Sequence, residues 1–171
     1  NNLALTVKTD SGTKSLASAF SYSFGITVTP NTAPSGSTVT LDILGAGFES
    51  LAPFTTAGNT ANGHIYLVRG TATAAAYDPT ETGPASGIKT VGQIQECTNV
   101  LIISDLEVLC TLNLNGQVSN ATPPVANATP VPNGAYSITV VSSGAAVAAA
   151  NLGTITRSLI TSGSTFTVAP Y

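Results

Sequence analysis

Apolar and polar residues alternate with a period of two along most of the chain, and this pattern predicts strands and almost no helix. Segment Thr38–Leu44 is the clearest case, because Val, Leu or Ile occupies every second position between Thr and Asp. Clusters of Gly, Pro, Asn and Ser separate such segments, which predicts a β-sandwich or barrel. The predicted strands span residues 3–8, 19–24, 25–29, 38–44, 64–69, 100–104, 107–114, 135–141 and 165–169.

Three segments lack this alternation, and we expect them to be loops. Residues 71–87 mix Ala, Thr, Pro and acidic side chains. Residues 119–133 contain several prolines, which cannot donate hydrogen bonds in a central strand. Residues 142–153 include an Ala-rich stretch that predicts a short helix or a buried apolar hairpin.

The two ends of the chain share a partial repeat. Residues 3–12 read as a strand followed by a Ser-Gly turn, and an aromatic-bearing strand follows after a spacer at 19–22. Residues 136–144 and 165–168 repeat that arrangement. The first copy has no domain before it to complete.

Several motifs resemble the IPT/TIG family of immunoglobulin-like domains. Residues 26–41 are similar to the family's opening, in which a strand ends in Pro, a Gly-containing turn follows and a Thr/Val strand comes next. Gly45-Ala46-Gly47-Phe48 matches its G-x-G-F corner, and residues 133–140 with 166–168 match its closing hairpin. The resemblance implies an all-β, immunoglobulin-like sandwich over residues 25–171 with no catalytic residues of its own. Glycine at 45 and 47 permits a sharp turn or a positive φ, and Phe48 can close the end of the sandwich.

On this interpretation, residues 1–24 form a separate N-terminal strand or hairpin. The chain is then either a fragment of a tandem array or a whole subunit whose first strand completes the sandwich of a neighbouring copy, which is a form of β-augmentation. A third alternative is that the segment adds a strand to its own domain. We expect Leu3, Leu5 and Val7 to form the docking strand.

The composition argues against several partners. Charged residues make up 8% of the chain, against about 25% in an average soluble domain. The net charge is -3, and the five Lys and Arg are scattered, so we expect no nucleic-acid partner and no anionic membrane surface. No apolar run approaches the roughly 20 residues of a membrane-spanning helix. A surface rich in Ser, Thr, Asn and Gly favours close association between subunits.

The two cysteines, Cys97 and Cys110, predict a disulfide across neighbouring strands. The alternative is a metal or redox pair, which would need CxxC spacing or histidine partners that the sequence lacks. A disulfide together with the low charge predicts an extracellular or cell-surface protein.

No pattern indicates an enzyme or a cofactor site. His64 is the chain's one histidine, it follows a turn, and we expect a solvated or edge-strand side chain. No nucleophile-elbow, Walker or dinucleotide motif occurs. The acidic pairs Asp78 with Glu81 and Asp105 with Glu107 supply too few oxygens for calcium, and a hairpin tip at 104–105 explains the second pair.

Two sequons, at Asn120 and Asn127, are candidate N-glycosylation sites within the Pro-rich segment. Such triplets also arise by chance in a chain rich in Asn and Thr, so the alternative is a pair of unmodified turn residues. Glycans at these positions would protect an extracellular surface.

These features favour a structural subunit of an extracellular filament, pilus-like thread or surface layer that assembles head to tail by β-strand exchange. Its partners would be identical copies of itself or adjacent immunoglobulin-like domains. The alternative is a cell-surface adhesin or carbohydrate-binding accessory module, with glycans as partners and exposed aromatic rings as the platform. A virion decoration domain is a third hypothesis. For the carbohydrate-binding alternative, the candidate aromatic rings are those of Tyr66, Tyr77, Tyr136 and Tyr171.

Overall fold

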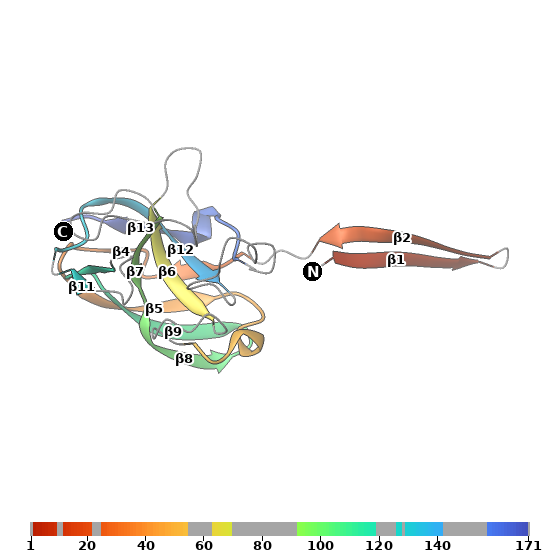
Figure 1. Ribbon diagram of the computed structural model, residues 1–171, viewed down its shortest axis with the longest axis horizontal. Helices are drawn as coiled ribbons and strands as arrows, with labels where there is room; N and C mark the ends of the chain where they lie inside the picture. Colours follow the sequence, from red (N-terminus) through yellow and green to blue (C-terminus); the bar gives the residue numbers. More distant parts are fainter. Residues whose placement is uncertain are drawn as a thin grey trace.

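The computed structural model describes residues 2–9, 12–21, 25–54, 63–69, 92–118, 126–127, 129–141 and 157–170. These residues form two facing sheets and, N-terminal to them, a separate hairpin (Figure 1). The predicted all-β sandwich is therefore confirmed. Among the described residues, no helix has the length and apolar character to cross a membrane.

One sheet has four antiparallel strands in the order β3-β5-β9-β8. The central pair, β5 and β9, is in register over its whole length, from Thr38 opposite Asn113 to Leu44 opposite Glu107. The strands are β3 (Thr27–Thr29), β5 (Thr38–Leu44), β9 (Glu107–Asn113) and β8 (Thr98–Ser104).

The other sheet has five strands in the order β4-β13-β12-β6-β7. All neighbours are antiparallel except β4 and β13, which pair in parallel. Two short strands, β10 and β11, pair with each other outside both sheets. The bounds are β4 (Thr32–Ala33), β13 (Thr165–Val168), β12 (Gly134–Val141), β6 (His64–Arg69), β7 (Gly92–Glu96), β10 (Gln117–Val118) and β11 (Ala126–Asn127).

The core lies between the two sheets and follows the predicted alternation. In β5, Leu41 and Ile43 are fully buried while Thr40 is exposed. Strand β9 alternates in the same way. From the five-stranded sheet, β6, β12 and β13 contribute buried side chains that include Ile65, Ile138 and Phe166. Burial of such side chains is the main favourable term in the folding of a sandwich.

Strands β6 and β12 are buried on both faces. Tyr66, Val68 and Val141 form a second small cluster apart from the main core. This accounts for the sequence of β6, His-Ile-Tyr-Leu-Val-Arg, in which apolar side chains fill consecutive positions.

The Gly45–Phe48 corner has the geometry that its sequence predicts. Gly47 has a φ of +85°, and Phe48 is fully buried at the end of the core. A Cβ on residue 45 would lie 2.8 Å from the Phe48 ring, so glycine is required there for packing. The corner leads into the short 3-10 helix η1 (Glu49–Leu51). Asp105 holds it through two acceptors: its carbonyl accepts from the Phe48 amide at 3.2 Å, and its carboxylate accepts from the Glu49 amide at 3.2 Å.

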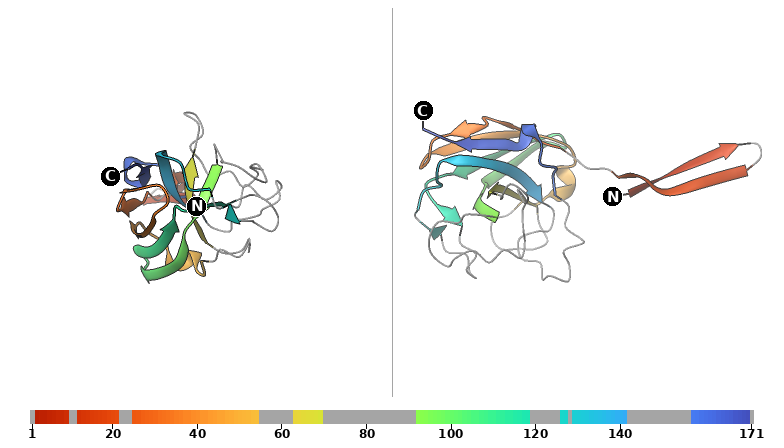
Figure 2. Two further views of the ribbon diagram at one scale, coloured as in Figure 1. Left: turned by 90° about the vertical axis from the view of Figure 1, so that its left-hand side faces the viewer. Right: turned by 90° about the horizontal axis from the view of Figure 1, so that it is seen from above.

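The N-terminal hairpin consists of β1 (Asn2–Thr9) and β2 (Gly12–Ser21). It projects away from the sandwich in Figure 1 and in the right-hand view of Figure 2. Strand β1 contains the predicted strand 3–8. The predicted spacer before residue 19 is wrong, because residues 12–21 form one continuous strand paired with β1.

The sequence did not predict four strands. They are β4, β7 and the short pair β10 and β11; β11 falls in the segment 119–133 that was expected to be a loop. Val131, in the same segment, is fully buried, and its amide donates to the Leu114 carbonyl at 2.9 Å. The segments 71–87 and 142–153, with the predicted Ala-rich helix or hairpin, lie outside the described residues.

Candidate assembly surface

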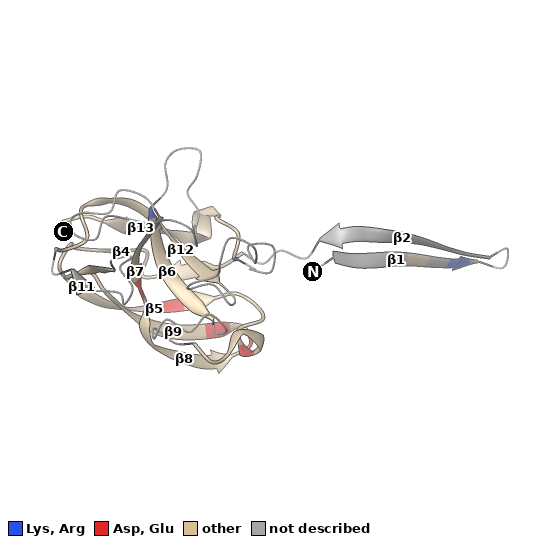
Figure 3. Cartoon of the chain, viewed as in Figure 1, with Lys and Arg blue, Asp and Glu red and all other residues tan. Residues whose placement is uncertain are grey.

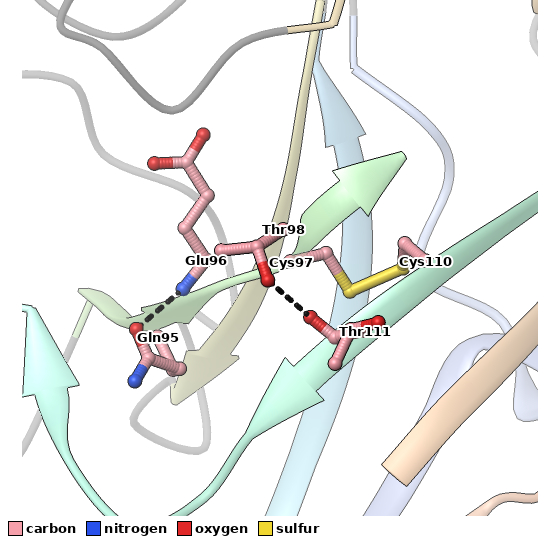
Figure 4. Close-up of a disulfide and its surroundings, with 6 residues drawn as sticks. All are labelled: Gln95, Glu96, Cys97, Thr98, Cys110 and Thr111. Carbon is pink, nitrogen blue, oxygen red and sulfur yellow. Dashed lines mark hydrogen bonds between the residues drawn. A yellow bond between two sulfur atoms is a disulfide. The ribbon is translucent and has the colours of Figure 1, made fainter. Parts of the chain in front are cut away.

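The predicted disulfide between Cys97 and Cys110 is present, with a Cα–Cα distance of 5.6 Å (Figure 4). Cys97 lies where the chain leaves β7 in the five-stranded sheet and enters β8 in the four-stranded sheet. Its amide donates to the Ile65 carbonyl of β6 at 2.8 Å, while its sulfur is bonded to Cys110 in β9. Because both cysteines are buried, the disulfide fixes this crossing from inside the core.

Side-chain hydrogen bonds strengthen the same crossing. The Thr98 hydroxyl donates to the Thr111 carbonyl at 3.3 Å, and the Glu96 amide donates to the Gln95 side-chain oxygen at 2.9 Å (Figure 4). The Gln95 amide nitrogen donates to the carbonyls of Asn113 and Gly116, at 2.9 and 2.8 Å. The Gln95 side chain therefore ties β7 to the end of β9 and to the turn that follows it.

His64 is buried, so the prediction of a solvated or edge-strand histidine is wrong. Strand β6 lies between β12 and β7, which places His64 inside the sheet. Its Nδ1 is 2.6 Å from Oε1 of Glu96, and its ring stacks on Tyr66 with centroids 5.5 Å apart. Among the described residues, no group of three His, Cys, Asp or Glu side chains could hold a metal ion.

Tyr136 is also buried, and its hydroxyl donates to the Pro132 carbonyl at 2.6 Å. The Arg69 guanidinium carbon lies 5.2 Å from the centre of its ring, a cation–π arrangement. Burial raises the pKa of Tyr136 above 10.0, and the positive charge of Arg69 opposes part of that rise. Tyr66 and Tyr136 are thus unavailable for an exposed sugar platform, while Tyr77 and Tyr171 lie outside the described residues.

Four large apolar side chains are exposed together on the four-stranded sheet. Leu101 and Ile103 are 57% and 50% exposed on β8, an edge strand. Leu106, in the turn between β8 and β9, and Leu44, opposite Glu107 at the end of β5, extend the same region. We call these four residues the β8 apolar surface. A second exposed apolar pair, Leu159 and Ile160, lies elsewhere, beside the bridge from Leu159 to Gly25.

Acidic residues lie on the same four-stranded sheet, where the ribbon is coloured red (Figure 3). Apart from Glu96, all acidic side chains of the described residues lie on the four-stranded sheet or at its end: Asp42, Glu49, Asp105 and Glu107. The hairpin carries Lys8, which is exposed, and Lys14. By sequence, residues 1–24 carry two lysines and Asp10, whereas the described residues of the sandwich carry five acidic side chains and two arginines.

The predicted docking residues Leu3, Leu5 and Val7 all lie in β1. The register sets Leu3 opposite Phe20 and Leu5 opposite Leu16. Val7 lies opposite Lys14, and the register shifts between Leu3 and Leu5. Among the described strands, only β2 pairs with β1.

The remaining predicted site residues lie near β10 and β11. Asn120 is outside the described residues, and Asn127 is in β11, where its backbone pairs with Gln117. Glycosylation at both positions stays a prediction.

The geometry therefore defines a class: an all-β sandwich with an internal disulfide and a projecting hairpin. No family model, curated protein or solved structure matches the chain.

Proposed function

We propose that the sandwich is immunoglobulin-like. The order β3-β5-β9-β8 corresponds to strands A, B, E and D of that fold, and β13-β12-β6-β7 corresponds to G, F, C and C′. The Tyr136 hydrogen bond also supports this assignment. Immunoglobulin-like domains place a tyrosine near the start of strand F, where its hydroxyl bonds to the backbone a few residues upstream. Together with the resemblance of the Gly45–Phe48 corner, these features favour an IPT/TIG-type domain.

We propose that the protein is a structural subunit of an extracellular filament, pilus-like thread or surface layer, and that copies assemble through the N-terminal hairpin. The observation that carries this proposal is the hairpin itself, a two-stranded sheet set apart from the sandwich (Figure 1). A two-stranded hairpin alone in water is marginally stable at best. It gains stability when its strands join a larger sheet, and a neighbouring copy offers one.

The exchange takes the form of an added edge strand. The sandwich already contains a strand at each position of the immunoglobulin-like order, and its core residues, such as Leu41 and Ile138, are fully buried without β1. The hairpin therefore extends a sheet of its partner and fills no gap in the partner's core. Such a contact joins two different surfaces, so it propagates into an open chain of subunits unless its rotation closes a ring.

Two further features support an extracellular location. The buried disulfide is the kind of crosslink that persists in oxidising compartments. The low content of charged residues leaves little repulsion between packed subunits. The alternative function, a sugar-binding module, has no exposed aromatic platform among the described residues to support it.

The proposal is tested by comparing the whole chain with a variant that lacks residues 1–21 and with the full-length variant Thr6→Pro. Proline removes a backbone donor and disrupts β1, whereas the matched control Thr6→Val keeps the strand intact. We expect concentration-dependent assembly of the wild type and of Thr6→Val in sedimentation and electron microscopy. Both hairpin variants should assemble at least about ten times less. Equal assembly without the hairpin, or a wild type that stays monomeric at high concentration, would refute the proposal.

A further inference from the structure

We infer that the edge strand β8 of one copy receives the hairpin of the next copy, with β1 pairing along it. This inference rests on the proposed assembly function and adds the receiving site. The product is a sheet that spans two copies in the order β2-β1-β8-β9-β5-β3.

Strand β8 is the longest edge that the described sandwich offers. Of the four edge strands, β3 has three residues, β4 has two and β7 has five, while β8 has seven. Strand β7 is also held to the end of β9 and the turn after it through the Gln95 side chain. A backbone pairing of useful length is therefore best made at β8.

Strand β8 lacks two of the features that usually protect a sheet edge, charge and proline, although its pairing with β9 is irregular at two places. Its sequence, Thr-Asn-Val-Leu-Ile-Ile-Ser, contains neither charge nor proline. Leu101 and Ile103 are half exposed or more, where a protected edge would carry Lys or Glu. The pairing of β8 with β9 is irregular between Thr98 and Leu101 and between Ile102 and Ser104, and Asn99 has a positive φ. We therefore expect the hairpin to pair with residues 100–103 of β8.

Strand β1 fits this edge in length and in charge. It has eight residues, and among the described strands only β2 occupies one of its edges. Lys8, which is exposed near the end of β1, would approach Asp105 and Glu107, which follow β8 in the chain. Opposite charges on the two surfaces speed encounter and fix register. Cross-strand contacts would cover Leu101 and Ile103.

The receiving strand belongs to another copy because of where the hairpin is attached. The chain passes from the hairpin to β3, which lies at the opposite edge of the four-stranded sheet from β8. The hairpin also points away from the sandwich in Figure 1 and in the right-hand view of Figure 2. It is therefore directed toward a neighbour and away from the β8 edge of its own sheet.

The first test uses two matched double variants of the full chain. Leu101→Lys with Ile103→Lys places charges on β8, and Leu159→Lys with Ile160→Lys makes the same change at the other exposed apolar pair. All four side chains are about half exposed, between 44% and 57%, so both variants should unfold near the wild-type temperature. We expect the β8 variant to lower the assembled fraction at least tenfold and the control to stay within about twofold of wild type.

The second test is site-directed crosslinking. Thr6→Cys protein is mixed with Ile103→Cys protein under mild oxidation, and the control mixture replaces the latter with Thr167→Cys on β13. The native disulfide is buried and should not exchange. We expect a covalent dimer from the first mixture alone. Crosslinking uses neither lysine variant, so it tests the inference even when those variants fail to fold.

The outcomes separate the two proposals. If the wild-type protein does not assemble, the proposed assembly function is refuted. Three results with an assembling wild type would mean that the hairpin binds elsewhere. The β8 variant could assemble as well as wild type, or both lysine pairs could weaken assembly alike. Thr6→Cys could also crosslink preferentially to Thr167→Cys. The β8 inference alone would then be overturned.

Discussion

At the residue scale, Tyr136 combines burial with a hydrogen bond that belongs to the turn before its strand. Its hydroxyl ties β12 to Pro132, and its ring lies under the Arg69 guanidinium. Tyr136 therefore connects its strand to the preceding turn through a hydrogen bond and to Arg69 through a cation–π contact.

Replacing this tyrosine tests the contribution of the hydrogen bond. Tyr136→Phe keeps the ring and removes the hydroxyl, so we expect the free energy of unfolding at pH 7 to fall by about 1 kcal/mol in urea titrations. Arg69→Met is a useful comparison, because it removes the cation and keeps an unbranched apolar side chain. An unchanged stability in Tyr136→Phe would mean that water replaces the bond at no net cost.

The same residue predicts a dependence of stability on pH. Burial raises the pKa of folded Tyr136 above 10.0, whereas the unfolded tyrosine titrates near 10.0. Below pH 10 both states hold the proton, so the residue adds no pH dependence there. As pH rises from 10 to the folded-state pKa, the unfolded state ionises first and stability falls. We therefore expect the stability gap between wild type and Tyr136→Phe to narrow above pH 10.

His64 shows the limit of sequence reasoning at this scale. Its position after a turn suggested exposure, but tertiary pairing places β6 inside a five-stranded sheet. Its partner Glu96 is 32 residues away in the sequence and lies in a strand that was not predicted. No local pattern could have joined these two side chains.

At the element scale, the sequence predicted best the strands whose own apolar residues mark them as strands. Thr38–Leu44 and His64–Arg69 were predicted with the bounds observed for β5 and β6. Strand β7 was missed because Gly-Gln-Ile-Gln-Glu has one apolar side chain, and pairing with β6 makes it a strand. In β2, pairing with β1 likewise extends the strand through Ser, Thr and Ala positions. The disulfide was predicted from the cysteine count, but its place at the crossing between sheets was not.

The disulfide should contribute measurably to the stability of that crossing. It joins cysteines 13 positions apart, and for a loop of this length chain entropy gives about 3 kcal/mol. We expect Cys97→Ala with Cys110→Ala to lose roughly that much in urea unfolding, with the fold retained. A loss below about 1 kcal/mol would indicate that packing alone holds β7, β8 and β9 together.

At the scale of the whole molecule, the sandwich and the hairpin should behave as separate units until copies meet. Among the described residues, the core draws its buried side chains from Ile26 onward, so a variant without residues 1–21 should match the monomeric wild type within about 0.5 kcal/mol. Assembly adds stability by mass action. We therefore expect the Tm of the wild type, measured by calorimetry, to rise with protein concentration while that of the shortened variant stays constant.

The position of β3 and β8 at opposite edges of one sheet has a mechanical consequence. In a filament joined as inferred above, tension enters a subunit through β3 and leaves it through β8. Because the force runs along the strands, the ladders β3–β5, β5–β9 and β9–β8 are each sheared. Within a sheared ladder all hydrogen bonds resist together, whereas peeling would break them singly. Such a thread should resist stretching far better than the modest strength of any one contact suggests.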